Sequence, residues 1–345
     1  MDSGKDRMRN ADKRRAFSLI ELLVVMVVIA ILVAILVPTL GGARNTARAA
    51  STKAQLTDLA NASQQFITDK GRQPGYFSAR LMGDTANENR GFTAMQNVML
   101  DLAGGIVTTS GAGTVEVGPT TSDTVRVDLT LIGTREAGGG YYTPDATRFI
   151  AQTGEGAGTL VGNSDHQALP SVVDAFGTPI LAWQRDRTAI QPIEAEADFV
   201  KVNTSGTTPA RFYWASNAGL LKTGTLGKRG KTALFTTATQ EHSLLGDGAT
   251  SLINNLVVLL GSPTVPGSRP NLPSAARADL LFHSAGIDAL YMGSRDIGGR
   301  SGQVQFWQNF YADAGGSQRL LDGQGRVETV DVLSRFDDLI QTAGN

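Results

Sequence analysis

Histidine is rare in this sequence and cysteine is absent, so two side chains that often bind metals or act in catalysis contribute little. The three histidines, His166, His242 and His283, lie far apart and have no H-x-x-x-H spacing, which argues against a zinc site. The chain has no cysteine, which excludes disulfides, thiolate metal sites and thiol catalysis. No G-x-S-x-G sequence offers an exposed serine nucleophile. We therefore expect that the chain is not an enzyme.

One basic stretch, GTLGKRGKT at Gly224–Thr232, is similar to a phosphate-binding loop. The G-x-x-x-x-G-K-T spacing requires glycine at position 225, where the sequence has Thr225. We interpret the stretch as a basic turn. The whole chain has 31 Lys+Arg against 32 Asp+Glu, and its basic residues do not alternate with aromatic ones, so we expect no nucleic-acid partner.

A single carboxylate, Glu21, lies within an apolar run near the start of the sequence. The run is 21 residues long, from Phe17 to Val37, and Glu21 is its only ionisable residue. As a helix it would be about 31 Å long, close to the thickness of a hydrocarbon core. A carboxylate near the middle of a bilayer costs about 2.5–3.5 kcal/mol on insertion scales, so such a residue usually has a partner. Residues 1–16 carry six basic and three acidic residues, which predicts that this end stays in the cytoplasm.

The residues alone leave two interpretations of this run open. A removed signal peptide is the first, although the run is longer than usual and no A-x-A cleavage site follows it. A plain membrane anchor, with Glu21 near the headgroups, is the second. A third interpretation follows from a family resemblance, described below.

Helical spacing continues beyond the apolar run and predicts a long helix that ends before Pro74. Its apolar stripe comprises Leu56, Leu59, Phe66 and Ile67. Gly41 and Gly42, just after Pro38, each cost about 1 kcal/mol relative to alanine and predict a local bend or melted turn.

The remaining sequence is rich in glycine and reads mainly as short strands and turns. Alternating residues predict a half-buried strand over 125–131, with GTVEVG at 113–118 as a hairpin partner. Residues 133–168 are predicted to form a long loop. ARFYWASNAG at 210–219 is predicted as a strand, and ATSLINNLVVLLGSP at 249–263 as a short buried helix.

The sequence RRAFSLIE, from Arg14 to Glu21, resembles the cleavage and methylation motif of type IV prepilins and type II secretion pseudopilins. The resemblance implies that a prepilin peptidase cuts between Ala16 and Phe17 and methylates the new amine of Phe17. Ala16 stands where the family usually has glycine. Pro38 lies where many pilins have a helix-bending proline. Glu21 is expected to meet the terminal amine of a neighbouring subunit, so that a subunit at the wrong height leaves both charges unpaired.

Two later stretches resemble parts of pseudopilin heads. VVDAFGTPILAWQRD at 172–186 resembles a D-x-W/F-G-x-P turn, in which we expect Asp174 to cap the turn. LLFHSAGIDALYMGSRDIGG at 280–299 resembles the calcium-binding loop of major pseudopilins, with Ala289 where glycine is usual and Arg295 as an added charge. The resemblance implies that Asp288 and Asp296 are possible calcium ligands.

Calcium takes six to eight oxygens, so further ligands are needed, and Asp337 and Asp338 are candidates. The alternative is a turn without an ion, whose aspartates cap backbone amides.

The expected fold class is α+β and pilin-like, with a long membrane-inserted N-terminal helix packed on an antiparallel sheet head. We expect a leader peptide at 1–16, a transmembrane and filament-core helix at 17–37 and an amphipathic continuation at 38–73. A globular head at 74–345 follows, with a Gly-rich insertion at about 104–168.

The resemblance implies that the chain is a structural subunit of a pilus-like filament. Among such subunits, we favour a type II secretion pseudopilin. Two features favour the type II secretion system over the type IV pilus. They are the head motifs and the absence of the C-terminal cysteine pair that is common in pili. The alternative is a minor type IV pilin, or a membrane-anchored adhesin that binds a ligand with its large head. Implied partners are prepilin peptidase, other pilin or pseudopilin subunits and an inner-membrane assembly platform. The chain is expected to cross the bacterial inner membrane once, with the head periplasmic or extracellular.

Overall fold

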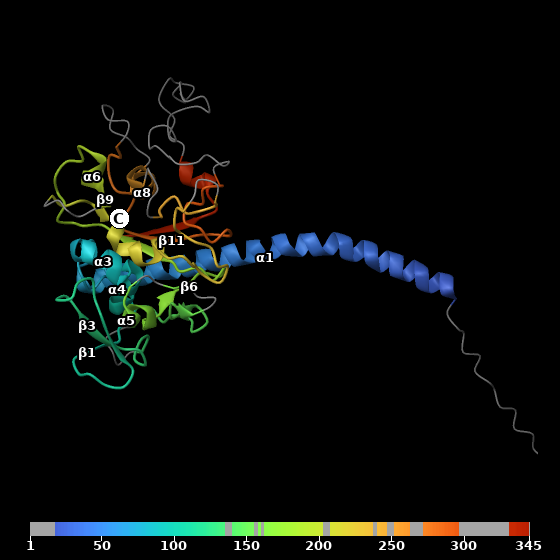
Figure 1. Cartoon of the computed structure of the whole chain (residues 1–345), viewed down its shortest axis with the longest axis horizontal. Helices are drawn as coiled ribbons and strands as arrows, with labels where there is room; N and C mark the ends of the chain where they lie inside the picture. The colour runs from blue at the N-terminus through green and yellow to red at the C-terminus, as the bar shows by residue number, and fades with distance from the viewer. Residues whose placement is uncertain are drawn as a thin grey trace, which may run out of the picture. The chain divides into compact units, whose positions relative to one another are not determined.

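The computed structural model describes most of the chain beyond the N-terminal segment (Figure 1). The described residues are 18–134, 140–154, 158–159, 162–202, 208–236, 240–246, 252–262, 272–296 and 331–344. The chain divides into two compact units, residues 1–47 and 48–345.

Helix α1 comprises 52 residues, Leu19–Lys70. It is continuous through Pro38, Gly41 and Gly42, so the predicted melted turn is wrong. A helix gains one hydrogen bond for each residue added to a formed segment, and this cooperativity outweighs the local cost of two glycines. The large hydrophobic residues of the first unit, from Leu19 to Leu40, are at least half exposed, and α1 is long and apolar enough to cross a membrane.

The second unit is built around a three-stranded antiparallel sheet with the order β12-β11-β8. Its strands are β8 (Leu181–Gln184), β11 (Leu280–Ser284) and β12 (Leu339–Ala343). All five residues of β11 are buried, as expected for a central strand covered on both faces.

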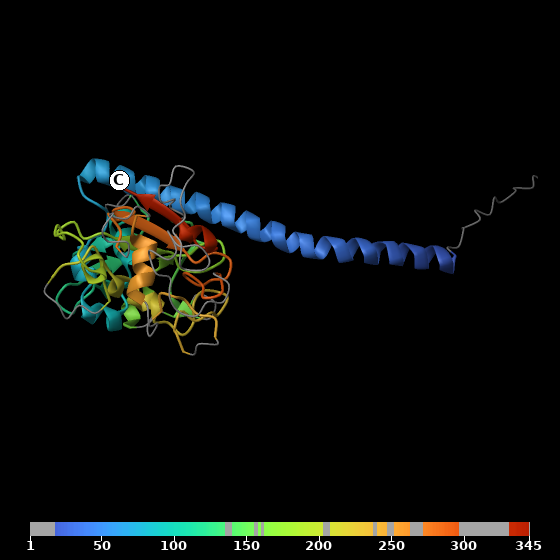
Figure 2. The same ribbon diagram turned by 90° about the horizontal axis from the view of Figure 1, so that it is seen from above.

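Alternate residues of these strands face two different hydrophobic layers. On one face, Ala182 and Phe282 pack with Leu59 and Phe66 of α1 and with α4 (Ala94–Leu102). Figure 2 shows β11 and β12 beside this part of α1. The C-terminal part of α1 therefore contributes to the hydrophobic core of the head.

On the other face of the sheet, Leu181, Trp183 and Leu281 pack with helix α8 (Leu252–Leu260). This helix is almost wholly buried and ends next to Gly261, as the sequence predicts. Trp214 lies in the same cluster, and its indole Nε1 donates a hydrogen bond of 2.9 Å to the Leu245 carbonyl.

A second small sheet confirms the predicted hairpin. Strands β2 (Thr114–Val117) and β3 (Val125–Asp128) pair antiparallel, and β1 (Ile106–Val107) pairs with the other side of β3. Val117, Val125 and Val127 are buried in a third cluster, as the alternation predicts.

Two other predictions are wrong in part. The stretch 133–168 is more than a loop: it contains β4 (Phe149–Ile150), β5 (Thr153–Gly154), β6 (Gly158–Thr159) and α5 (Ser164–Ala168). The stretch 210–219 is a strand only at β10 (Phe212–Tyr213). It continues as a 3-10 turn, η2 (Trp214–Asn217), and α7 (Ala218–Leu221), because Ala-Gly-Leu-Leu buries its apolar side chains as a helical turn.

The remaining short elements connect these parts. They are α2 (Ala79–Met82), α3 (Thr85–Arg90), β7 (Ser171–Val172), α6 (Glu196–Phe199), β9 (Val200–Lys201) and η3 (Val332–Arg335). A long N-terminal apolar helix followed by a head with antiparallel sheets confirms the predicted α+β fold class.

Candidate functional site

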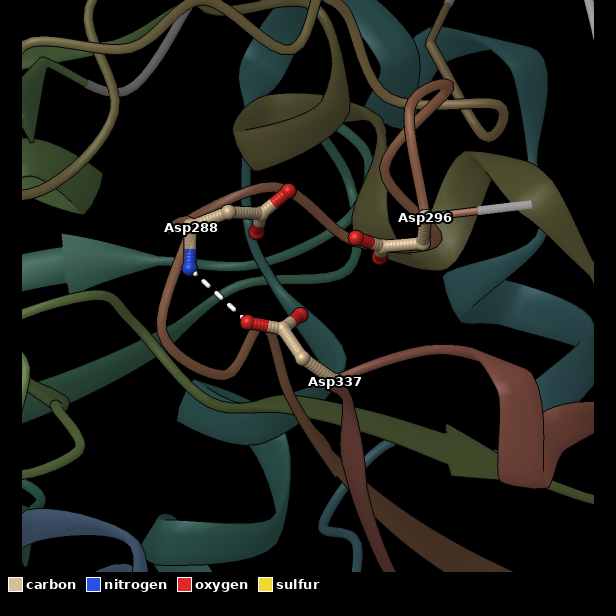
Figure 3. Close-up of side chains that lie close together, drawn as sticks. All are labelled: Asp288, Asp296 and Asp337. Carbon is tan, nitrogen blue, oxygen red and sulfur yellow. Dashed lines mark hydrogen bonds between the residues drawn. The ribbon is translucent and has the colours of Figure 1, made fainter. Parts of the chain in front are cut away.

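The register of β11 and β12 brings Asp337 beside the predicted calcium loop. Ser284, the last residue of β11, lies opposite Leu339, the first residue of β12. The residues just before β12 therefore lie against the residues just after β11. One oxygen of Asp337, Oδ2, accepts a hydrogen bond of 2.6 Å from the backbone amide of Ile287. The same oxygen accepts a hydrogen bond of 2.9 Å from the backbone amide of Asp288 (Figure 3).

Asp288, Asp296 and Asp337 form an acidic cluster (Figure 3). One carboxylate oxygen from each lies within 4.8 Å of the others. Asp288 Oδ2, Asp296 Oδ2 and Asp337 Oδ1 are buried and have no hydrogen-bond partner among the described residues. The two aspartates predicted from the sequence thus lie together, and a third joins them from a distant segment.

The second carboxylate oxygens of Asp288 and Asp337 accept hydrogen bonds from backbone amides. The two alternatives drawn from the sequence, a calcium site and a turn with amide-capping aspartates, are therefore compatible in these residues. Asp288 Oδ1 accepts a hydrogen bond of 2.7 Å from the amide of Leu290, and Asp337 Oδ2 caps two amides as described above. Each of these two side chains therefore organises the loop with one oxygen and leaves the other oxygen unpaired.

Asp338 does not join the cluster. It bonds to the buried His283 through Nε2 and accepts the amide of Met292 at 3.0 Å. Asp337 and Asp338 are neighbours in the chain, yet only Asp337 contributes an oxygen to the group of three.

The electrostatics of the cluster favour neutralisation of its charge. Burial, reinforced by the charge of Asp337, raises the pKa of Asp288 to about 8. Burial and the same charge raise the pKa of Asp296 to about 6, and burial also raises the pKa of Asp337. A divalent cation bound to the three free oxygens would offset this repulsion, and carboxylate oxygens are the ligands that calcium prefers. The residues present therefore fit such an ion.

Gly293 keeps the space between the carboxylates open. A Cβ at this position would lie 2.3 Å from Asp288 Oδ2 and 3.1 Å from Asp296 Oδ2. A methyl group there must displace at least one of the two carboxylates.

If the cluster binds calcium, we expect Gly293→Ala to abolish stabilisation of the chain by the ion. The measurement is the thermal unfolding midpoint of the detergent-solubilised chain in calcium and in chelator. Gly224→Ala is the matched control, because a Cβ at Gly224 meets no atom within 4 Å. A calcium response in Gly293→Ala equal to that of Gly224→Ala would contradict a site between these carboxylates.

The loop around the cluster is strained. Ala289 (φ 66°) and Met292 (φ 50°) are the non-glycine residues with positive φ in the described chain. An L-residue in this left-handed conformation costs about 1–2 kcal/mol. Ala289 is also where the family resemblance leads one to expect glycine.

We expect Ala289→Gly to stabilise the chain by up to about 1 kcal/mol, because glycine adopts positive φ without the Cβ clash but loses more entropy on folding. Urea unfolding followed by tryptophan fluorescence measures the change. A fall in the unfolding free energy would contradict a strained backbone at this residue.

Asp174 caps the predicted turn and also connects it to β11. Its Oδ1 accepts the amides of Phe176 and Thr178, each at 2.9 Å, which agrees with the predicted capping role. Its Oδ2 accepts a hydrogen bond of 2.7 Å from the hydroxyl of Ser284, a contact that sequence reasoning did not find. Burial raises the pKa of Asp174 to about 6.

At the start of α1, Ser18 and Glu21 form a capping box. The backbone amide of Ser18 donates to Glu21 Oε2 at 2.9 Å, and the amide of Glu21 donates to the Ser18 hydroxyl at 3.2 Å. Ala16 and Phe17, the predicted processing residues, lie outside the described residues, and Pro38 lies within α1.

Two surface hollows of the head lie outside the Gly-rich stretch at 104–168. A hollow of 420 Å³ is lined by residues from 72–79 and 184–188, and one of 320 Å³ by residues from 78–85 and 201–213. Neither includes a residue of 104–168.

Comparison with known proteins identifies the N-terminal motif. Residues 12–37 match the family model of the prokaryotic N-terminal methylation motif, the signature of type IV pilins and pseudopilins. Comparisons with curated proteins and with solved structures found no match.

Proposed function

Because residues 12–37 carry the N-terminal methylation motif of type IV pilins and pseudopilins, we propose that the chain is a structural subunit of a pilus-like filament. The motif implies processing by prepilin peptidase and assembly with other pilin subunits. We place the cut between Ala16 and Phe17 and the methyl group on the amine of Phe17. The observation that carries the proposal is this motif at the start of a long apolar helix, which fits membrane anchoring.

Glu21 has a defined task in this proposal. Cleavage creates a positive amine at Phe17, and a neighbouring subunit presents its own amine to Glu21 as the filament grows. An unpaired carboxylate in apolar surroundings is costly, so correct register is favoured over wrong register. Helix α1 thus serves first as an anchor and then as the packed core of the filament.

Within this class we favour a type II secretion pseudopilin over a minor type IV pilin. The turn at Asp174 and the acidic loop at 285–296 are similar to head motifs of pseudopilins, and the chain lacks cysteine. An inner-membrane assembly platform is the expected partner, with the N-terminus of the anchored precursor in the cytoplasm.

We further propose that Asp288, Asp296 and Asp337 hold calcium in the head. The support is the set of three unpaired, buried carboxylate oxygens and the space beside Gly293. A bound ion would join the loop after β11 to the segment before β12 and so fix the end of the central sheet.

Capture of cross-linked partners tests the assignment to a machine. The full chain, with a C-terminal affinity tag, is cross-linked in cells that produce prepilin peptidase, purified from membranes and analysed by mass spectrometry. We expect secretion pseudopilins and their platform proteins among the captured chains. Capture of pilus subunits instead would favour the type IV alternative, and absence of any filament subunit would contradict the proposal.

A further inference from the structure

The basic turn at 224–232 packs against the turn that Asp174 caps. The amide of Lys228 donates to the Gly177 carbonyl at 3.3 Å. The two backbones approach so closely that a Cβ at Gly227, whose φ is +60°, would lie 2.9 Å from that same carbonyl oxygen. The turn is therefore part of the packed head and is positioned by it.

This packing places Arg229 beside the acidic cluster. Its guanidinium lies 5.8 Å from the centre of the Phe176 ring and donates a hydrogen bond to the carbonyl of Ile287. The amide of the same Ile287 donates to Asp337. Arg229 therefore binds the carbonyl of Ile287, and Asp337 binds the amide of the same residue.

The charge of Arg229 acts on the cluster. Burial raises the pKa of Asp337, and the positive charge of Arg229 offsets a small part of that rise. Two other cations, Lys231 and Arg295, form ion pairs with Glu241 at 3.0 and 3.4 Å, and the charge of Glu241 acts on Asp296.

We propose that Arg229 is a built-in counter-cation of the Asp288–Asp296–Asp337 cluster, and that its charge weakens the binding of calcium there. This inference rests on the calcium site proposed above. A guanidinium that contacts the loop attracts the carboxylates when no ion is bound and repels a divalent cation that enters. Removing the charge should therefore tighten calcium binding.

Linkage makes the effect reciprocal. If Arg229 weakens the binding of calcium, bound calcium weakens the attachment of Arg229 to the loop by the same factor. The basic turn, which carries the exposed Lys228 and Arg229, then becomes looser when the site is filled.

Calorimetric titration of the detergent-solubilised full chain with calcium chloride tests the proposal. Arg229→Gln keeps an N–H donor for the Ile287 carbonyl and removes the charge. We expect it to bind calcium about three- to tenfold more tightly, an effect that falls at high salt. Arg229→Lys keeps the charge and should bind as the original chain does. Lys228→Gln, which removes an equal charge from the same turn, should change the affinity less than twofold.

The outcomes separate this inference from the calcium site itself. Equal calcium affinity in Arg229→Gln and Lys228→Gln would overturn the role of Arg229 and leave the site intact. Absence of binding in all four proteins would overturn both. A thermal readout gives a second check: Arg229→Gln should lower the unfolding midpoint in chelator, and saturating calcium should reduce or reverse that deficit. A deficit independent of calcium would mean that Arg229 is only structural.

Discussion

We expect replacement of Glu21 with alanine to abolish incorporation of the chain into filaments and to leave its membrane insertion unchanged. Loss of one partner from a buried ion pair costs about 3–5 kcal/mol, because the other charge remains unpaired. That amount corresponds to more than about a hundredfold in an assembly equilibrium. Insertion itself depends on the apolar length of α1, which the substitution does not shorten. The measurement compares the chain in the membrane fraction with the chain in sheared or cross-linked filaments.

Glu21→Gln separates charge pairing from helix capping. Glutamine at this position retains the capping box with Ser18 but carries no charge. If the amine of a neighbouring subunit is the partner, Glu21→Gln fails to assemble just as Glu21→Ala does. Normal assembly of Glu21→Gln would reduce the role of Glu21 to the capping interaction seen in the structure.

If the cluster binds calcium as proposed, we expect replacement of Asp288 with asparagine to abolish the response to calcium and to remove an electrostatic penalty from the ion-free head. Burial raises the folded pKa of Asp288 to about 8, above its ordinary value of 3.8, so between these values the folded chain binds more protons than the unfolded chain. Stability contributed by this group is therefore present below about pH 4 and is lost as pH rises towards 8. In chelator at pH 8, we expect Asp288→Asn to unfold about 2–4 °C higher than the original chain, the shift that about 1 kcal/mol produces.

Calcium should have the opposite pH dependence. The ion competes with protons for the carboxylates, so its stabilising effect on the original chain grows from pH 5 to pH 8. Asp198→Asn is a suitable control, since Asp198 lies on α6 and caps the amides of Glu194 and Ala195, away from the cluster. A calcium response in Asp288→Asn equal to that of the control would contradict the proposed site.

The features that depend on local sequence could be predicted. The apolar run from Phe17 predicts the start of α1. The strict alternation of apolar and polar residues predicts strand β3, and with it the hairpin of β2 and β3. The Ser18–Glu21 capping box was missed, although its S-x-x-E spacing is a recognised signal at a helix start. The Pro38–Gly42 region shows the limit of local propensity, since the long helix on both sides overrides two glycines.

The acidic cluster depends on a pairing that no local pattern reveals. Asp337 meets Asp288 because Ser284 lies opposite Leu339 across two antiparallel strands. A shift of that register by one residue would place Asp338 where Asp337 now lies. The sequence therefore identifies both aspartates as candidates and cannot choose between them. The contact of Arg229 with Ile287 similarly joins turns 58 residues apart.

The mass and sequence of the mature N-terminus test the central claim most directly. The chain is purified from membranes of cells with and without active prepilin peptidase, and its N-terminal peptide is analysed by mass spectrometry. With the peptidase, we expect a chain that begins at N-methylated Phe17 and lacks residues 1–16; without it, the leader remains. An intact leader in the presence of active peptidase would contradict the claim that this chain is a processed filament subunit.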